Sequence, residues 1–336
     1  MKNYIFDDVI LLDVDLSLFG EPKTNTTASE GLSDEMKTYY SDYLIDMAEP
    51  NLVHDQFGQK QNIPKNGGKT IQFRKYSPLP KLTTPLEEGK TPSGQTLNMT
   101  IVEATVAQYG GYIELSDMLI MTAIDNNLVQ ATKLLGGQAG RTLDAITREV
   151  LVGGTNVQYA EQQVTSRAAL KGGATDGNHY LTVNAIRMAV RTLKKMNAEK
   201  IDGSYVAIIH PDCSYDLMSD PNWKYPHQYQ DTTNIYEGEI GKIEGVRFVE
   251  TSEAKIFEKA GASGRDVYAT LVLGDNAYGT TSLSGGGLEH IVKQLGSAGT
   301  ADPLNQRATA GWKATKTAVR LVEEYMVRIE TTASAS

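Results

Sequence analysis

The sequence has few residues that support covalent or metal-based stability. Its 336 residues include one cysteine, Cys213, which excludes an intrachain disulfide and a site built from several thiolates. The five histidines are scattered, and no H-E-x-x-H pair places two imidazoles on one helix face. We therefore expect no metal and no cofactor, so that stability comes from packing or from assembly.

Long apolar runs and an excess of basic residues are also missing. The sequence has no run of about 18 uncharged apolar residues, which excludes a spanning helix, and aspartates interrupt the apolar N-terminus, which argues against an export signal. Lys and Arg total 32 against 41 Asp and Glu, and a net charge of −9 argues against a protein whose whole surface binds nucleic acid. We expect a soluble, cytosolically made chain with no membrane partner and roughly two domains at about 150 residues each.

The front of the chain reads as an arm followed by a long hairpin. Residues 1–31 are acidic and then polar, and a helix is expected from Ser33 to Pro50. Between 59 and 115, apolar residues alternate with polar ones in two stretches. The gap between these stretches contains four of the chain's 11 prolines. Such a hairpin is marginal alone, so it is expected to lie on another subunit.

Within this hairpin the apolar alternation changes phase. It runs through Leu97, Met99 and Ile101 and then through Val102, Ala104 and Val106, which predicts a β-bulge that reverses the inward face. From Ser116 to about Gly153 the period becomes helical. Three glycines inside this helix predict a close backbone contact or a kink, and they are Gly136, Gly137 and Gly140.

The rest of the chain reads as an α/β unit followed by a strand. Thr182 is expected to cap a helix whose apolar stripe ends at Met196, and Pro211 is expected to begin a second helix after the strand Tyr205 to His210. Strands are expected in 241–250 and 267–273. The alternation from Gly311 to Thr332 predicts one long strand with a single buried face.

Motifs for catalysis are weak. The string Asn66-Gly67-Gly68-Lys69-Thr70 lacks the first glycine of a phosphate loop and precedes a strand pattern, so a plain turn is favoured. His210, Asp212 and Cys213 cluster at a helix start, where capping and burial explain them more simply than a thiol nucleophile or a metal site. A hydrolase or nucleotide-binding enzyme is thus the least favoured interpretation, and we predict a protein that is not an enzyme and has no catalytic residue.

Several strings, in order, resemble those of tailed-phage major capsid proteins, in the branch typified by coliphage N-four. The resemblance covers about residues 32–332. The strings include Lys37-Thr38-Tyr39-Tyr40, Asn51-Leu52-Val53-His54-Asp55-Gln56-Phe57-Gly58, Ile71-Gln72-Phe73-Arg74-Lys75-Tyr76, Leu86-Glu87-Glu88-Gly89, Ile209-His210-Pro211-Asp212, Gly245-Val246-Arg247-Phe248-Val249-Glu250-Thr251, Gly274-Asp275-Asn276-Ala277-Tyr278-Gly279, Gly311-Trp312-Lys313 and Met326-Val327-Arg328-Ile329-Glu330.

The resemblance implies an α+β chain with the Hong Kong 97-type capsid fold. Its parts find counterparts in the segments read above. These are an N-terminal arm (1–31), an extended hairpin loop (59–115), an axial α/β domain (180–284), and a discontinuous peripheral domain (32–58, 116–179 and 285–336) with a spine helix at about 116–152.

The function implied is self-assembly. The resemblance implies pentamers and hexamers of an icosahedral virion shell, assembled in the host cytoplasm. Its partners would be further copies of the chain, a portal, scaffold or decoration proteins, and double-stranded DNA held by nonspecific inner-face contacts. An encapsulin-like compartment is the alternative with the same fold. The residues expected at contacts between subunits are Arg74, Lys81, Glu87, Glu88, Lys90 and Arg141.

Overall fold

The computed structural model describes ten segments of the chain and several isolated positions between 79 and 91. The segments are 24–25, 53–62, 69–76, 94–122, 127–172, 178–223, 241–281, 288–293, 295–297 and 302–334. The predicted arm (apart from 24–25) and the predicted helix from Ser33 lie outside the described residues. So do about half of the positions in the proline-rich tip, residues 78–92.

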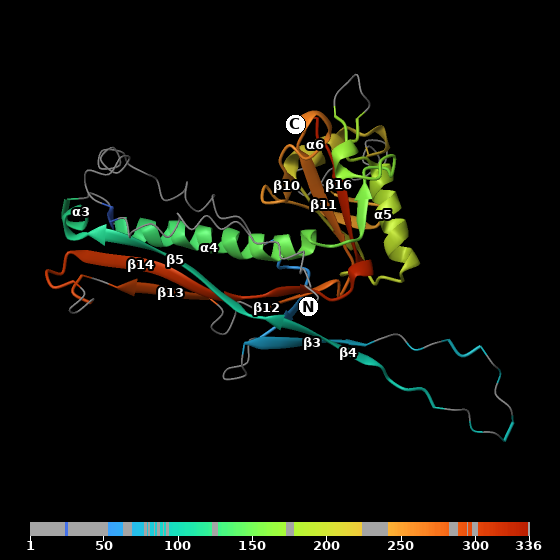
Figure 1. Cartoon of the computed structure of the whole chain (residues 1–336), viewed down its shortest axis with the longest axis horizontal. Helices are drawn as coiled ribbons and strands as arrows, with labels where there is room; N and C mark the ends of the chain where they lie inside the picture. Colours follow the sequence, from blue (N-terminus) through green and yellow to red (C-terminus); the bar gives the residue numbers. More distant parts are fainter. Residues whose placement is uncertain are drawn as a thin grey trace, which may run out of the picture. The chain divides into compact units, whose positions relative to one another are not determined.

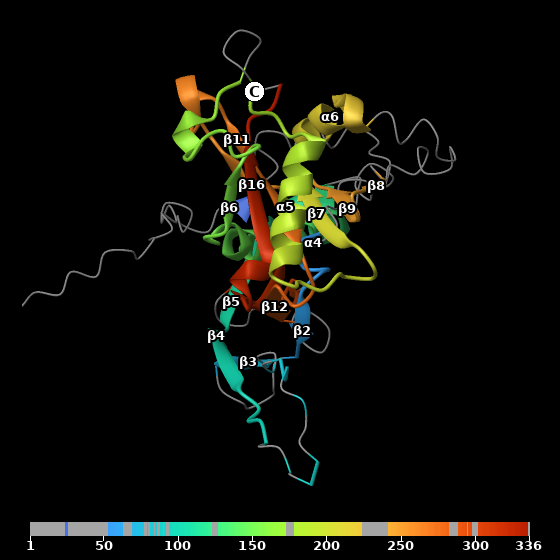
Figure 2. The same ribbon diagram turned by 90° about the vertical axis from the view of Figure 1, so that its right-hand side faces the viewer.

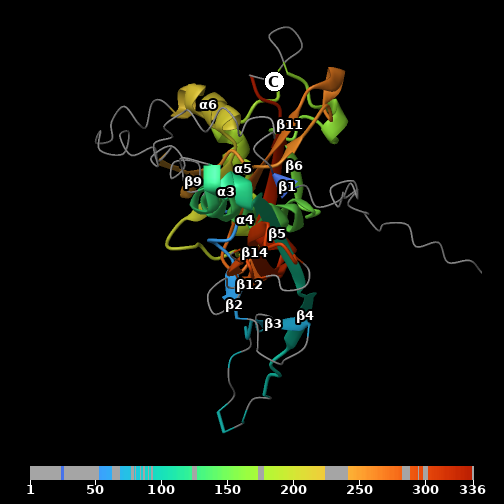
Figure 3. The ribbon, with the colours of Figure 1, turned by 90° about the vertical axis from the view of Figure 1, so that its left-hand side faces the viewer.

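The chain divides into two compact units. The first comprises Met1–Met47, Gly111–Leu135 and His290–Trp312, and the second comprises Ala48–Gly110, Gly136–Glu289 and Lys313–Ser336. A four-stranded sheet in the order β1-β5-β14-β13 contributes to the first unit. Its strands β5 and β14 lie side by side in Figure 3. The bounds of its strands are β1 (Thr24–Asn25), β5 (Ala107–Ser116), β14 (Arg307–Lys316) and β13 (Leu288–Lys293).

The second unit contains a seven-stranded mixed sheet. Its order is β6-β16-β11-β7-β9-β8, with β10 paired to β11. Helix α5 (Val183–Lys195) lies against this sheet (Figure 2). The strands are β6 (Val157–Tyr159), β16 (Met326–Thr331), β11 (Val267–Leu273), β7 (Tyr205–Ile209), β9 (Val246–Glu250), β8 (Lys242–Ile243) and β10 (Ile256–Phe257).

This sheet is buried on both faces, which explains its uninterrupted apolar strands. Ala207 and Val272 pack in the cluster that contains the apolar side of α5, whereas Ile208 and Leu271 pack in a second cluster with the end of α4 (Asn127–Val152). Thr182 caps α5 by accepting from the amide of Ala185, as predicted. The predicted stripe is wrong at its last residue, because Met196 is 47% exposed.

Two strand predictions fail for identifiable reasons. The region predicted as one strand from Gly311 divides into the end of β14, β15 (Ala318–Arg320), a 3₁₀ turn (Glu323–Tyr325) and β16. Every residue of β16 is buried, so the expected single buried face is wrong. Arg328 and Glu330 are buried there because they pair with each other, and Arg167 adds a second ion pair to Glu330.

The predicted bulge is also wrong. Strand β3 (Thr70–Tyr76) pairs with β4 (Met99–Thr105) in unbroken antiparallel register, from Thr70 opposite Thr105 to Tyr76 opposite Met99. Ile71 and Phe73 share the buried face with Ala104. Met99 and Ile101 lie on the opposite face of this ribbon. The apolar series that ends at Ile101 and the one that begins at Val102 therefore occupy the two faces of one regular ribbon.

The long helix differs from its prediction at its start. Within the described residues, α3 (Asp117–Thr122) and α4 are assigned as separate helices, with 123–126 outside the described residues. Helix α4 runs continuously through its three glycines (Figure 1). Open space surrounds the Cβ position of Gly137, so the predicted close contact is wrong there.

A short sheet joins the base of the β3–β4 hairpin to the rest of the second unit. Strand β12 (Tyr278–Thr281) pairs with β2 (Gln59–Gln61) and with β15. A Cβ atom at Gly279 would collide with the ring of the fully buried Phe73. This glycine therefore allows the fully buried ring of Phe73 to lie directly on β12.

We expect Gly279→Ala to lower the free energy of unfolding by about 1–3 kcal/mol, because the methyl group must displace the Phe73 ring. Urea denaturation of the unassembled chain measures the change. Gly137→Ala is the matched control and should raise stability by up to about 1 kcal/mol, because its Cβ meets nothing in the helix. Equal stability of Gly279→Ala and the parent chain would contradict this packing.

Candidate functional site

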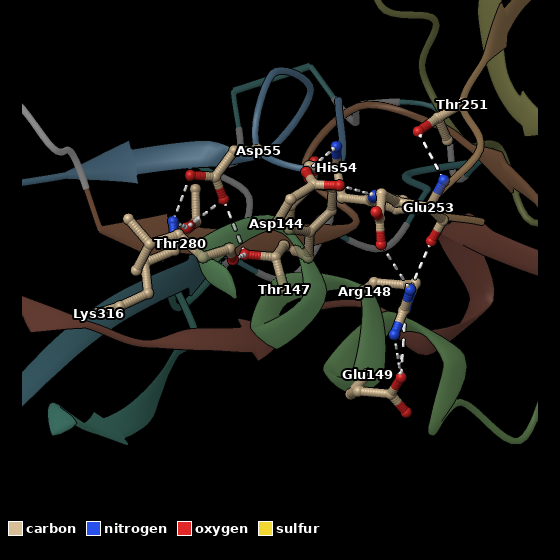
Figure 4. A network of polar contacts seen from close by, with 12 residues as sticks. His54, Asp55, Asp144, Thr147, Arg148, Glu149, Thr251, Glu253, Thr280 and Lys316 are labelled. Atoms are coloured by element: carbon tan, nitrogen blue, oxygen red, sulfur yellow. Dashed lines mark hydrogen bonds and ion pairs between the residues drawn. The ribbon is translucent and has the colours of Figure 1, made fainter. Parts of the chain in front are cut away.

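The second unit contains a buried ion pair between Lys316, at the end of β14, and Asp55, in the turn before β2. Lys316 is fully buried, and its Nζ donates to Asp55 Oδ2 and to Thr280 Oγ1, the latter at 2.7 Å (Figure 4). Burial lowers the pKa of Lys316, while the charge of Asp55 and its hydrogen bond oppose that shift. Since a lone buried charge is costly, each partner is needed to keep the other in place.

The second oxygen of Asp55 is also satisfied. Asp55 Oδ1 accepts from Thr147 Oγ1 at 2.8 Å and from Thr280 Oγ1 at 3.0 Å. Thr147 comes from α4 and Thr280 from β12, as Figure 4 shows. The carboxylate therefore links a turn, a helix and two strands that are far apart in sequence.

His54 ties the same turn to α4. Its backbone amide donates to Asp144 Oδ1 at 2.7 Å, and its Nδ1 lies 2.6 Å from Asp144 Oδ2. The hydroxyl of Tyr278 donates to the carbonyl oxygen of His54. Burial raises the pKa of Tyr278, so its hydroxyl stays protonated and able to donate. The turn is fixed from both sides by groups that water does not reach.

The polar contacts continue toward solvent along α4. Arg148 bonds Glu149 at 2.8 Å and the carbonyl oxygen of Glu253 at 2.6 Å, while Lys255 Nζ lies 2.9 Å from both oxygens of Glu149. Burial raises the pKa of Glu149, but the hydrogen bonds and charges of Lys255 and Arg148 outweigh it and lower the pKa overall. Both cations hold Glu149 in its ionised form.

The network is suited to holding segments together. Each carboxylate in its buried part already accepts hydrogen bonds, and among the described residues no group of three or more His, Cys, Asp or Glu is placed to hold a metal. No helix in the described part of the chain is long and apolar enough to cross a membrane.

The two weak catalytic motifs have structural roles where they are described. His210 caps α6 (Pro211–Ser219) by accepting from the amide of Asp212, and Asp212 accepts from Tyr268 at 2.8 Å. Cys213 is fully buried, and burial raises its pKa to about 12, so its thiol is a poor nucleophile. Thr70 begins strand β3, where a phosphate loop would begin a helix.

The predicted contact residues are spread over several elements. Lys81 and Glu88 are exposed in the hairpin extension, Arg74 is exposed on β3, and Arg141 is exposed on α4. No hydrogen bond or ion pair joins any two of these four, and Glu87 and Lys90 lie outside the described residues. The four described residues therefore do not form a single site through direct polar contacts.

The face of the hairpin opposite Phe73 exposes apolar side chains beside polar ones such as Arg74 and Glu103. Opposite the face that holds Phe73, Ile101 is 44% exposed and Met99 is 45% exposed, and Leu97 just before the strand is 66% exposed. Leu79 and Leu82 are also exposed. Apolar patches of this kind mark surfaces that another protein covers.

The buried network was missed by sequence reasoning, although one signal was present. Along β14, buried positions alternate through Ala308, Ala310, Trp312 and Ala314, and the next position in that series is Lys316. The period of two therefore places a lysine on an inward face. A charge at such a position requires a partner, and Asp55, which is distant in sequence but close in space, supplies it.

We expect Lys316→Met to lower the free energy of unfolding by about 3–5 kcal/mol, because Asp55 then remains buried without its cation. Asp55→Asn should be destabilising for the converse reason. The double variant should lose less than the sum of the two single losses, by about 1–3 kcal/mol, because neither charge remains. Urea denaturation of all four chains measures the coupling, and strictly additive losses would contradict a direct pair.

Comparison with solved structures identifies the fold. The capsid of Ralstonia phage GP4 superposes with a TM-score of 0.67 at 15% identity, covering 92% of this chain and 98% of that chain. The cyanophage Pam1 capsid gives 0.63 at 15% identity, covering 97% and 100%. The cyanophage P-SCSP1u capsid gives 0.62 at 14% identity, covering 87% and 90%. The predicted α+β Hong Kong 97-type fold is confirmed.

A search of curated proteins found no significant match. The sequence profile of the family described as phage capsid protein matches residues 100–326, which is more than half of the chain. This match covers β4 almost completely, helix α4, β14 and every strand of the seven-stranded sheet except β16. The chain belongs to the phage capsid protein family, and it is a structural protein of an icosahedral phage shell.

Proposed function

We propose that this chain is the major capsid protein and forms the pentamers and hexamers of a shell around double-stranded DNA. The exposed apolar face of the β3–β4 hairpin supports this proposal most directly. A two-stranded ribbon with one buried face has marginal stability in water. If a neighbouring subunit covers the second face, its apolar side chains are no longer exposed to water. The hairpin then contributes more to the stability of the shell than to the stability of the isolated subunit.

The predicted contact residues fit this arrangement. On the exposed face of the ribbon, Arg74 lies directly opposite Ile101. A neighbour that covers Ile101 therefore also meets a cation. We propose that Arg74, Lys81, Glu87, Glu88, Lys90 and Arg141 contact neighbouring subunits through salt-sensitive polar interactions.

We propose the division into an arm, a hairpin loop, a peripheral domain and an axial domain on the ground of the family resemblance. The axial segment 180–284 supplies the central strands β11, β7 and β9 of the seven-stranded sheet, and β16 and β6 complete that sheet from the peripheral segments. We also propose membership of the branch typified by coliphage N-four, on the ordered strings over residues 32–332. A profile built from that branch alone should score this chain above profiles of other capsid branches.

We further propose a portal and scaffold or decoration proteins as partners, virion localisation after assembly in the host cytoplasm, and no enzymatic activity. The buried network supports the last point, because its groups are fully used in holding segments together.

Met99→Glu/Ile101→Glu should abolish shells while the subunit remains folded, because two charges on the exposed face oppose its burial but leave Phe73 untouched. Electron microscopy and sedimentation count shells, and circular dichroism follows folding. Met99→Leu/Ile101→Leu is the matched control, because it keeps the apolar area. Deletion of residues 77–91 should have the same effect as the charged pair. Normal shells from both disruptive variants would refute the proposed role of the hairpin.

The cargo separates a virion shell from an encapsulin-like compartment. We expect particles purified from infected cells to contain nuclease-protected double-stranded DNA, measured by the 260/280 nm absorbance ratio and by gel analysis after nuclease treatment. Empty shells made from the chain expressed alone provide the control. Particles that contain one enzyme and no protected DNA would instead identify a compartment.

A further inference from the structure

The outer face of α5 carries a basic stripe that the proposed function does not use. Helix α5 contains no acidic residue, and four cations occupy the side opposite its buried stripe. They are Arg187, Arg191, Lys194 and Lys195. The helix dipole favours Lys194 and Lys195 in the last turn, but it does not account for the two arginines further back.

Most of these cations have no partner in the described part of the chain. Arg187 forms an ion pair with Glu244 at 2.8 Å. No hydrogen bond or ion pair connects the side chain of Arg191, Lys194 or Lys195 to a described residue. In a chain with a net charge of −9, this is a local concentration of unpaired positive charge.

The stripe forms the side of a groove. The groove has a volume of about 540 Å³, and Met188 and Val190 contribute apolar lining between the cations. Glu244 lies on its rim. A fitting occupant thus carries negative charge together with apolar side chains.

The N-terminal sequence has this composition. Residues 1–23 carry five acidic residues against two lysines, and the acidic ones are Asp7, Asp8, Asp13, Asp15 and Glu21. The run from Val9 to Leu12 between two of the aspartate pairs is entirely apolar. The family resemblance and the proposed function assign this segment to an arm, but neither gives its acidic residues a binding partner.

We propose that residues 7–15 of this chain bind in the α5 groove, with their aspartates against Arg191, Lys194 and Lys195 and their apolar residues against Met188. This contact goes beyond the proposed function.

Double-stranded DNA is the competing occupant, and the groove suits it less well. Glu244 repels phosphate and aspartate alike and so does not separate the two, but the duplex backbone offers no apolar group to Met188. The acidic segment satisfies the cations and the apolar lining together. DNA binding at this stripe is nevertheless a distinct outcome of the experiment.

Zero-length carbodiimide coupling tests the contact, because it joins a carboxylate to an amine with no spacer and so requires the two groups to come into direct contact. Applied to assembled full-length protein, it should give peptides in which Asp7, Asp8, Asp13 or Asp15 is joined to Lys194 or Lys195, identified by mass spectrometry. Raising NaCl from about 0.05 to 1 M should suppress these links, because screening weakens exposed ion pairs.

Arg191→Glu should reduce the links about fivefold, since it leaves both lysines in place but reverses an adjacent charge. Asp13→Lys combined with Arg191→Glu should restore links from the remaining aspartates. Lys259→Glu is the matched control, because it makes the same kind of charge change at an exposed position away from α5.

Three results would overturn the proposal. They are the absence of arm-to-α5 links in assembled particles, links that Arg191→Glu leaves unchanged, and a 30-base-pair duplex whose binding is lost in Lys194→Glu/Lys195→Glu. Shell formation by the same variants is scored separately by electron microscopy, so failure of this contact is distinguishable from failure of the capsid function.

Discussion

The second unit depends on keeping one buried lysine paired. Lys316 has no access to water, and its charge is tolerated because Asp55 and Thr280 surround its amine. The carboxylate that neutralises it is in turn held by Thr147 of α4. Burial of this charge therefore requires a turn, a helix and two strands to adopt their positions together. A polar network of this kind specifies one arrangement, because alternative packings would leave a buried charge without its partner.

The position of the network explains how a marginal hairpin is held in a defined place. The turn that carries Asp55 leads directly into β2, and β2 pairs with β12, against which Phe73 packs. The base of the hairpin is thus fixed by a buried aromatic ring and by the neighbouring ionic network. Its second face remains apolar and exposed. A firmly anchored base with an uncovered apolar face is a suitable arrangement for a part whose burial is completed by assembly.

The sequence predicted most helices and strands, but it predicted the buried faces wrongly where a strand is buried on both sides. The period of the helix from Thr182 and the compact strand 267–273 were read correctly, because local alternation and capping chemistry determine them. In β16, charged Arg328 and Glu330 suggested a solvent-facing side, but partners distant in the chain neutralise them inside the core. Such pairings depend on tertiary contacts, and no local pattern reveals them.

The same limit applies to the site. Alternation along β14 pointed Lys316 inward, but its partner Asp55 lies 261 positions away in sequence. In β4, two apolar series were read as one face interrupted by a bulge. They are the two faces of one ribbon, of which the subunit buries only one. A strand with apolar residues on both faces is therefore evidence of a second packing partner, and we propose that this partner is a neighbouring copy.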